Sequence, residues 1–142
     1  MKTTTKAYVF VLFISSLWFP GAVSAQERGF EYRLGEIVKE YDFVVEVEIV
    51  PNRETNLQDI LVSPPAHTDY APKPFIYAVT YGIAELTGGS LAYQLFLGMV
   101  IIDTGKELYA ISAENCRKAF EFDTIDEQSE MLAKNLKKLR YE

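Results

Sequence analysis

The pattern of hydrophobic and polar positions separates the first 25 residues from the rest of the chain. A short basic start precedes an apolar run over residues 8–19, a Pro-Gly pair ends this run, and the small residues Ala22–Ala25 follow. This order is typical of a secretory signal peptide with its cleavage site. We therefore expect residues 1–25 to be removed, and the mature protein, which begins at Gln26, to be secreted or periplasmic.

The mature chain offers no second membrane signal. No later segment is an uninterrupted apolar stretch of the about 20 residues that cross a bilayer core. The run over residues 8–19 is itself too short for a membrane-spanning helix, and no cysteine directly follows Ala25 to carry a bacterial lipid anchor. We expect the mature form to have no membrane attachment.

After the cleavage site the apolar positions become periodic. Apolar residues between Leu34 and Tyr41 recur with the spacing i, i+3, i+4 and i+7, which predicts a short N-terminal helix over residues 31–41. From Asp42 to Val50 apolar and polar residues alternate, which predicts a strand with one buried face that ends at Pro51.

Three β-rich runs follow in the second half of the chain. Residues 75–86 and 91–103 are separated by Gly88-Gly89, and a second turn leads into residues 107–112. Runs of β-branched and aromatic residues between turn signals predict a three-stranded antiparallel meander. Strands of about 12 residues would run roughly 40 Å, far beyond the radius of gyration of about 13 Å expected for this length, so we expect the sheet to coil strongly.

The C-terminal region contains the clearest helix signal. Residues 113–120 are compatible with a short helix or a turn. The segment Thr124–Glu127 matches a capping box, and an apolar stripe continues from it to Leu139, with acidic residues early and basic residues late. This pattern predicts a C-terminal helix.

These elements predict one secreted α+β domain over residues 26–142. Its core is expected to be a strongly coiled antiparallel sheet of four to five strands, which could close into a small barrel. A short N-terminal helix and a C-terminal helix packed on one face complete the predicted fold. The 117 residues that remain of 142 are enough for a single hydrophobic core.

The charge of the mature chain restricts its partners. Loss of Lys2 and Lys6 from 14 basic residues leaves 12 against 20 acidic residues, a net charge of −8. Nucleic acids and anionic lipid surfaces attract clustered basic residues and repel such a chain. We therefore expect neither class of partner.

Cys116 is the only cysteine, so no intramolecular disulfide can form. Free cysteines are commonly small buried apolar residues, which is the interpretation we favour. The alternative is an intermolecular disulfide or a reactive thiol.

His67 is the only histidine and lies in a proline-rich loop over residues 52–74, where a short strand near residues 60–63 is the only element expected. A Ser-His-Asp arrangement can be written for it with Ser63 and with Asp59 or Asp69, which are near it in sequence. No Gly-x-Ser-x-Gly turn is present to expose such a nucleophile, and the loop lacks calcium-loop spacing. We expect solvated loop residues and predict no metal or cofactor.

Glu46 and Glu48 project from one side of the predicted strand, about 7 Å apart along it. Paired carboxylates at this range can act as acid and base in glycoside hydrolysis. The simpler interpretation is a solvated face whose charges oppose edge-to-edge aggregation.

The most prominent feature of the meander is aromatic. Its predicted register places five aromatic side chains on one sheet face, which is a binding surface if it is open, because tyrosine combines a large contact area with a polar tip. The alternative is that the coiling sheet and the N-terminal helix close this face into a core. The opposite sheet face is apolar throughout, and we expect the C-terminal helix to cover it. The five predicted binding residues are Phe75, Tyr77, Tyr81, Phe96 and Tyr109.

These observations lead to three functional hypotheses. The first is a non-enzymatic binding or protein-interaction domain whose partner is another extracytoplasmic protein or a small apolar ligand. The second is a small extracytoplasmic hydrolase that uses Glu46 and Glu48 or the His67 loop. The third is a homodimer in which two tyrosine faces meet.

Overall fold

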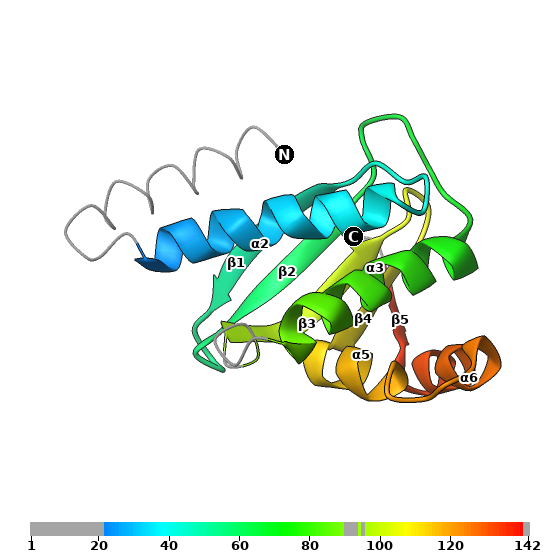
Figure 1. Ribbon diagram of the computed structural model, residues 1–142. Coiled ribbons are helices and arrows are strands. Elements are labelled where there is room, and N and C mark those ends of the chain that lie inside the picture. The colour runs from blue at the N-terminus through cyan, green and yellow to red at the C-terminus, as the bar shows by residue number, and fades with distance from the viewer. Residues whose placement is uncertain (1–21, 90–93, 95, 141–142) are drawn as a thin grey trace. The chain divides into compact units, whose positions relative to one another are not determined.

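The computed structural model describes residues 22–89, 94 and 96–140 (Figure 1). The chain divides into two compact units, Met1–Phe30 and Glu31–Glu142. Of the first unit the structure describes the beginning of helix α2 (Ala22–Lys39). Most of the predicted signal peptide lies outside the described residues, so its removal stays a prediction.

The second unit has an α+β fold, as predicted. It contains a five-stranded sheet with the strand order β1-β2-β3-β4-β5. Every neighbouring pair of strands is antiparallel except β2 and β3, which are parallel. After α2 the elements are β1 (Glu46–Asn52), β2 (Leu57–Ser63), α3 (Pro72–Gly88), β3 (Leu97–Asp103), β4 (Leu108–Ser112), α5 (Ala113–Ala119), α6 (Ile125–Asn135) and β5 (Lys137–Leu139).

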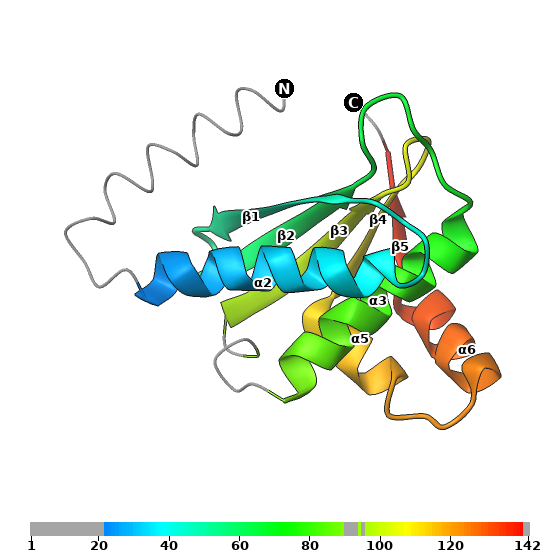
Figure 2. The ribbon, with the colours of Figure 1, turned by 45° about the horizontal axis from the view of Figure 1, so that its top comes forward.

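The prediction of a strongly coiled, purely antiparallel sheet is wrong. The sheet does not close into a barrel, and its longest strands have seven residues, which removes the steric reason for coiling. The parallel pair arises because α3 connects β2 to β3, and a helical crossover returns the chain in the same direction. Helices α3 and α5, with the part of α2 that belongs to this unit, lie on one side of the sheet (Figures 1 and 2).

Helix α3 replaces the first strand of the predicted meander. Pro72 stands at the start of the helix, where no backbone N–H is needed. Phe75, Val79 and Ile83 follow one another at intervals of four residues and are fully buried, so they form one helical face. Gly88 and Gly89 end this helix and do not form a hairpin turn.

The strand prediction failed because the apolar residues between 75 and 86 fit both the helical period of about 3.6 residues and the strand period of two residues. Aromatic and β-branched residues raise β propensity, but tertiary packing overrides such preferences. The buried Thr80 and Thr87 show how a strand-favouring residue is accommodated in the helix. Their hydroxyls donate to the carbonyl oxygens of Ile76 and Ile83, at 2.7 Å and 2.6 Å.

The second half of the predicted meander is correct. Strands β3 and β4 form an antiparallel hairpin, although β3 begins at Leu97, six residues later than predicted. The predicted register, which placed Tyr81 and Phe96 on one sheet face, is wrong, because Tyr81 lies on a helix.

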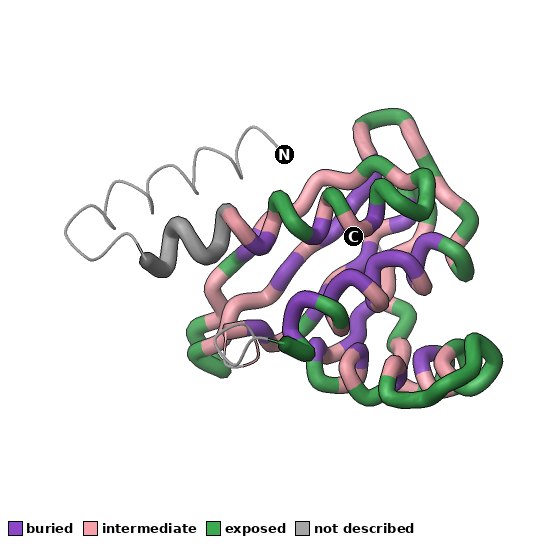
Figure 3. Tube along the Cα trace, viewed as in Figure 1, coloured by how far each residue is buried: buried purple, intermediate pink, exposed green. Residues whose placement is uncertain are grey.

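The two faces of the sheet have different surroundings. Ile49, Ile60, Val100 and Ile111 lie side by side in register, and all four are buried. Buried positions run along the strands beneath the helix layer (Figure 3). On the opposite face Met99 is 37% exposed. Within the described part of the second unit, α3, α5 and residues 31–39 of α2 leave this second face uncovered, since they lie on the other side (Figures 1 and 2).

The C-terminal helix begins as predicted but ends early and packs elsewhere. The hydroxyl of Thr124 accepts a hydrogen bond from the backbone N–H of Glu127, which confirms the cap. Helix α6 ends at Asn135, and residues 137–139 form the edge strand β5. The helix packs on α5, so the prediction that it covers the apolar sheet face is wrong.

Helices α2 and α3 approach each other closely at Gly82. A Cβ atom at this position would lie 2.6 Å from Cδ1 of Leu34 and 3.4 Å from Cγ2 of Ile37. The absence of a side chain at Gly82 therefore sets the spacing of the two helices, and this spacing brings the residues at the end of α2 beside α3.

Candidate functional site

Four aromatic rings meet on the helix layer, and we call them the tyrosine cluster: Tyr41, Tyr77, Tyr81 and Phe120. The centroid of the Tyr41 ring lies 6.3 Å from that of Tyr77 and 5.8 Å from that of Tyr81. The centroid of the Phe120 ring lies 5.2 Å from that of Tyr77 and 5.5 Å from that of Tyr81. All four contacts are edge-to-face, the geometry that aromatic quadrupoles favour.

Three separate elements position these rings. Tyr77 and Tyr81 are four residues apart on α3 and therefore share one helical face. Tyr41 follows the last turn of α2, and its backbone N–H donates to the carbonyl of Val38. Phe120 is the C-cap residue of α5. The cluster exists only where the ends of α2 and α5 meet the middle of α3.

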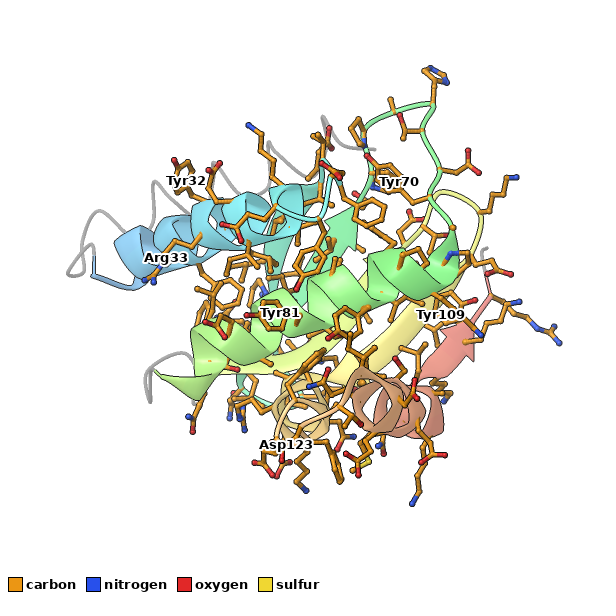
Figure 4. The ribbon with its side chains drawn as sticks, turned by 45° about the vertical axis from the view of Figure 1, so that its right-hand side comes forward. Tyr32, Arg33, Tyr70, Tyr81, Tyr109 and Asp123 are labelled. Carbon is orange, nitrogen blue, oxygen red and sulfur yellow. The ribbon has the colours of Figure 1, made fainter. Side chains whose placement is uncertain are left out.

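The cluster is accessible at the surface. Tyr41 is 38% exposed, and the other three side chains are half-buried. Tyr81 projects from α3 in Figure 4. The core beneath is filled by other side chains, among them Val79 and Ile83 of α3, so the cluster is not needed to close it.

Two carboxylates lie within the electrostatic reach of the cluster. Burial, followed by the neighbouring Glu85 carboxylate, raises the pKa of Tyr81. Burial also raises the pKa of Tyr41, with further contributions from the other two tyrosines and from Glu40 and Glu85. Both glutamates are exposed. The surface therefore combines electron-rich rings with negative charge.

The predicted binding residues are divided among several places. Tyr77 and Tyr81 belong to the tyrosine cluster. Phe75 is fully buried and contacts Phe43 and Tyr70, with ring centroids 5.2 Å and 5.0 Å away, so it is a core residue.

In the described part of the chain, neither Tyr109 nor Phe96 makes a ring contact with the tyrosine cluster. Tyr109 is on β4, and its hydroxyl donates to Oε1 of Glu107, whose Oε2 accepts from Lys138 at 2.9 Å. Phe96 stands half-buried directly before β3. The prediction that all five aromatic residues share one sheet face is wrong, because three of them are on α3.

Sequence reasoning missed Tyr41 and Phe120 as members of a site. The signal for Tyr41 was present, since it extends the apolar face of the N-terminal helix by one turn. Phe120 carries no comparable signal, because only the packing of α5 beside α3 brings its ring to Tyr77 and Tyr81.

The residues proposed for hydrolysis through His67 have other partners. Oδ1 of Asp59 accepts from the backbone N–H of Met99 at 3.0 Å, and Oδ2 accepts from Asn52 at 3.0 Å. Asp69 forms an ion pair with Lys106, with 3.3 Å between Oδ2 and Nζ. His67 itself is exposed in the loop. The structure does not assemble a Ser-His-Asp arrangement from these residues.

The carboxylate pair on β1 is on the same sheet face, as predicted. Glu46 pairs in register with Ser63, and Glu48 pairs with Leu61. Successive side chains of a strand point to opposite faces of the sheet. Because Ile49 is buried on the face toward the helix layer, Glu46 and Glu48 point to the opposite face. The pair is therefore separated from the tyrosine cluster by the thickness of the sheet.

The prediction that Cys116 is buried is confirmed. Its side chain on α5 is fully buried, and burial raises the pKa of the thiol. Because the thiolate is the reactive form, this environment suppresses its chemistry.

The described residues contain neither a candidate metal site nor a candidate membrane-spanning helix. Within them, no group of three or more His, Cys, Asp and Glu side chains is placed to hold a metal ion. No helix in this part of the chain is long and apolar enough to cross a membrane. Comparison with protein-family models, curated proteins and solved structures finds no match for this chain.

Proposed function

We propose that this protein is a non-enzymatic binding protein that acts outside the cytoplasm and holds another extracytoplasmic protein through the tyrosine cluster. The observation that supports this proposal is the contact of four aromatic rings at an accessible point of the helix layer, above a core that other residues fill. Tyrosine is enriched in protein interfaces because its ring adds contact area while its hydroxyl stays hydrogen-bonded.

The rings are held in place before any partner binds. Each ring contacts two others, and the hydroxyl of Tyr77 donates to Oε1 of Gln128 at 2.7 Å. Side chains that are already ordered lose little conformational entropy on association. This preorganisation suits an interface better than isolated exposed aromatic residues would.

A small apolar ligand fits the surface less well than a protein does. Such a ligand would remove water from Glu40 and Glu85 without replacing their hydrogen bonds, which is energetically unfavourable. A two-fold homodimer through the cluster would bring each glutamate toward its own copy, because a two-fold interface pairs a patch with itself. A different protein can supply groups that complement both the rings and the carboxylates.

The proposal is tested by capture from the native extracytoplasmic fraction with tagged mature protein, followed by mass spectrometry. The double variant Tyr41→Ala/Tyr81→Ala removes two rings of the cluster. Tyr32→Ala is the matched control, since Tyr32 is 69% exposed and projects from α2 away from α3 (Figure 4). We expect a partner that wild type and Tyr32→Ala retain and that the double variant loses, because interface anchors of this kind contribute about 2 kcal/mol or more.

Circular dichroism and urea unfolding of each variant show whether the fold is kept. A folded double variant that captures the same partner as wild type would contradict the proposal. So would a hydrolytic activity that Glu46→Gln or His67→Ala removes and the double variant leaves intact, because the enzyme hypothesis would then replace the binding hypothesis.

A further inference from the structure

We infer that the tyrosine cluster receives the guanidinium group of an arginine side chain in a basic segment of the partner protein. This inference rests on the proposed function and states the chemistry of the partner. It follows from the character of the rings, the carboxylates beside them and the sign of the charges around them.

The rings provide the first part of the site. The faces of aromatic rings are electronegative, and they attract a cation placed within about 6 Å of the ring centroid. Three of the four rings are phenols, and Tyr41 is accessible to a partner, with 38% of its surface exposed. The rings meet at interplanar angles between 60° and 75°, so their faces point in different directions.

The carboxylates provide the second part. Glu85 lies one helical turn after Tyr81 and therefore on the same face of α3, and Glu40 directly precedes Tyr41. The placement of these carboxylates agrees with the raised pKa of Tyr41 and of Tyr81, to which both glutamates contribute after burial. A cation at the cluster is therefore attracted by ring faces and by negative charge at the same time.

The segment after Phe120 extends the negative charge. Every charged residue from 121 to 130 is acidic, and all of them are exposed. Asp123 lies on this segment, on the α5 and α6 side of the cluster (Figure 4). The nearest basic side chain before it, Lys118, is paired with Glu114 at 3.6 Å. A partner with several basic residues complements this surface better than a partner with one.

Arginine suits the site better than lysine for geometric reasons. The guanidinium group is planar, stacks on aromatic faces and forms two parallel hydrogen bonds with a carboxylate. The ammonium group of lysine is compact and strongly hydrated, so it gains less from stacking. A site made of rings and carboxylates should therefore distinguish the two residues.

The test uses three peptides as probes, Gly-Arg-Gly-Arg-Gly and its counterparts with lysine or glutamate in place of arginine. Binding to the mature protein is measured by calorimetry and by the NMR signals of the tyrosine rings. We expect the arginine peptide to bind, the lysine peptide to bind several-fold more weakly and the glutamate peptide not to bind. Added salt should weaken binding, because exposed carboxylates contribute to it.

Matched variants locate the binding site. Tyr81→Ala should lower the affinity for the arginine peptide roughly tenfold, whereas Tyr81→Phe, which keeps the ring, should restore most of it. Glu85→Gln should lower the affinity several-fold without changing the shape of the side chain. Glu54→Gln, in the exposed turn between β1 and β2, and Tyr32→Ala should leave it unchanged.

Two results would overturn the inference: no binding of the arginine peptide, or binding that Tyr81→Ala and Glu85→Gln leave unchanged. Capture of the native partner separates this failure from failure of the proposed function. If the arginine peptide does not bind but Tyr41→Ala/Tyr81→Ala still loses the partner, only the assignment of arginine is wrong. If the double variant keeps its partner as well, both proposals are wrong.

Discussion

The hydroxyl group of Tyr77 on α3 donates a hydrogen bond of 2.7 Å to Oε1 of Gln128 on α6, 51 residues further along the chain. Nε2 of the same glutamine donates to the backbone carbonyl of Phe122 at 2.8 Å. Gln128 thus connects α3, the segment between α5 and α6, and α6 itself. Because the ring of Tyr77 also contacts Tyr41 and Phe120, this connection ties the tyrosine cluster to the C-terminal part of the fold.

A double-mutant cycle measures this connection. Tyr77→Phe and Gln128→Ala each remove one partner of the hydrogen bond, and each should lower the free energy of unfolding by about 0.5–1.5 kcal/mol. The double variant should lose less than the sum of the two, because the shared bond is lost only once. Urea unfolding of the four proteins gives the values, and strict additivity would show that the two side chains are not coupled.

The two faces of β3 are compared by neighbouring substitutions. Ile102→Ala should lower the free energy of unfolding by about 2–5 kcal/mol, because Ile102 is fully buried against the helix layer. Ile101→Ala should lower the free energy of unfolding by a smaller amount, since Ile101 is only half-buried on the opposite face. Equal large losses would show that this second face is covered in solution, and analytical ultracentrifugation would then show whether a second copy covers it.

The turn between β3 and β4 requires glycine at position 105. Gly105 has a φ of 100°, and a Cβ atom there would lie 2.5 Å from the carbonyl oxygen of Thr68. Gly105→Ala should therefore lower the free energy of unfolding by about 1–3 kcal/mol through backbone strain and displace the His67 loop. Gly35→Ala is the control, because Gly35 lies in α2 with no atom within 4 Å of the added Cβ, and alanine should be neutral or stabilising there. Thermal unfolding of both variants provides the comparison, and a Gly105→Ala protein as stable as wild type would contradict the strained turn.

The dependence of the protein's stability on pH in the acid range should involve Glu107. Hydrogen bonds from Tyr109 and Lys138 lower the pKa of Glu107 below its ordinary value of 4.5. Folding therefore favours the carboxylate, so this stabilisation is present above pH 4.5 and disappears as the pH falls through the lowered pKa. The melting temperature of Glu107→Gln should lie below that of wild type at neutral pH and converge with it in acid. A difference that stays constant with pH would contradict an electrostatic origin.

Cys116 should be unreactive in the folded protein. Burial raises the pKa of its thiol and keeps reagents away. We expect a thiol reagent such as Ellman's to modify it only after denaturation, and non-reducing electrophoresis to show no linked dimer. Rapid modification of the native protein, or a dimer that Cys116→Ser abolishes, would show that the thiol is accessible.

Local sequence patterns determined several elements of this protein without reference to the rest of the fold. The cap at Thr124 and the hairpin of β3 and β4 follow from interactions between residues close together in the chain, so their signals are complete within short windows. The burial of Cys116 and the α+β class could also be predicted without the rest of the fold. The burial follows from the usual behaviour of a free cysteine, and the α+β class follows from local periodicity. Tyr77 and Tyr81 were recognised as candidates for binding, although for the wrong structural element.

Only the tertiary structure decided whether residues 75–86 form a helix or a strand. Their sequence permits both, and the burial of one helical face against the sheet favours the helix by a margin that no local propensity supplies. The same packing created the tyrosine cluster, since Gly82 lets α2 approach α3 and thereby brings Tyr41 to Tyr81. Contacts between segments far apart in sequence depend on how the elements pack, and a one-dimensional pattern contains no record of that packing.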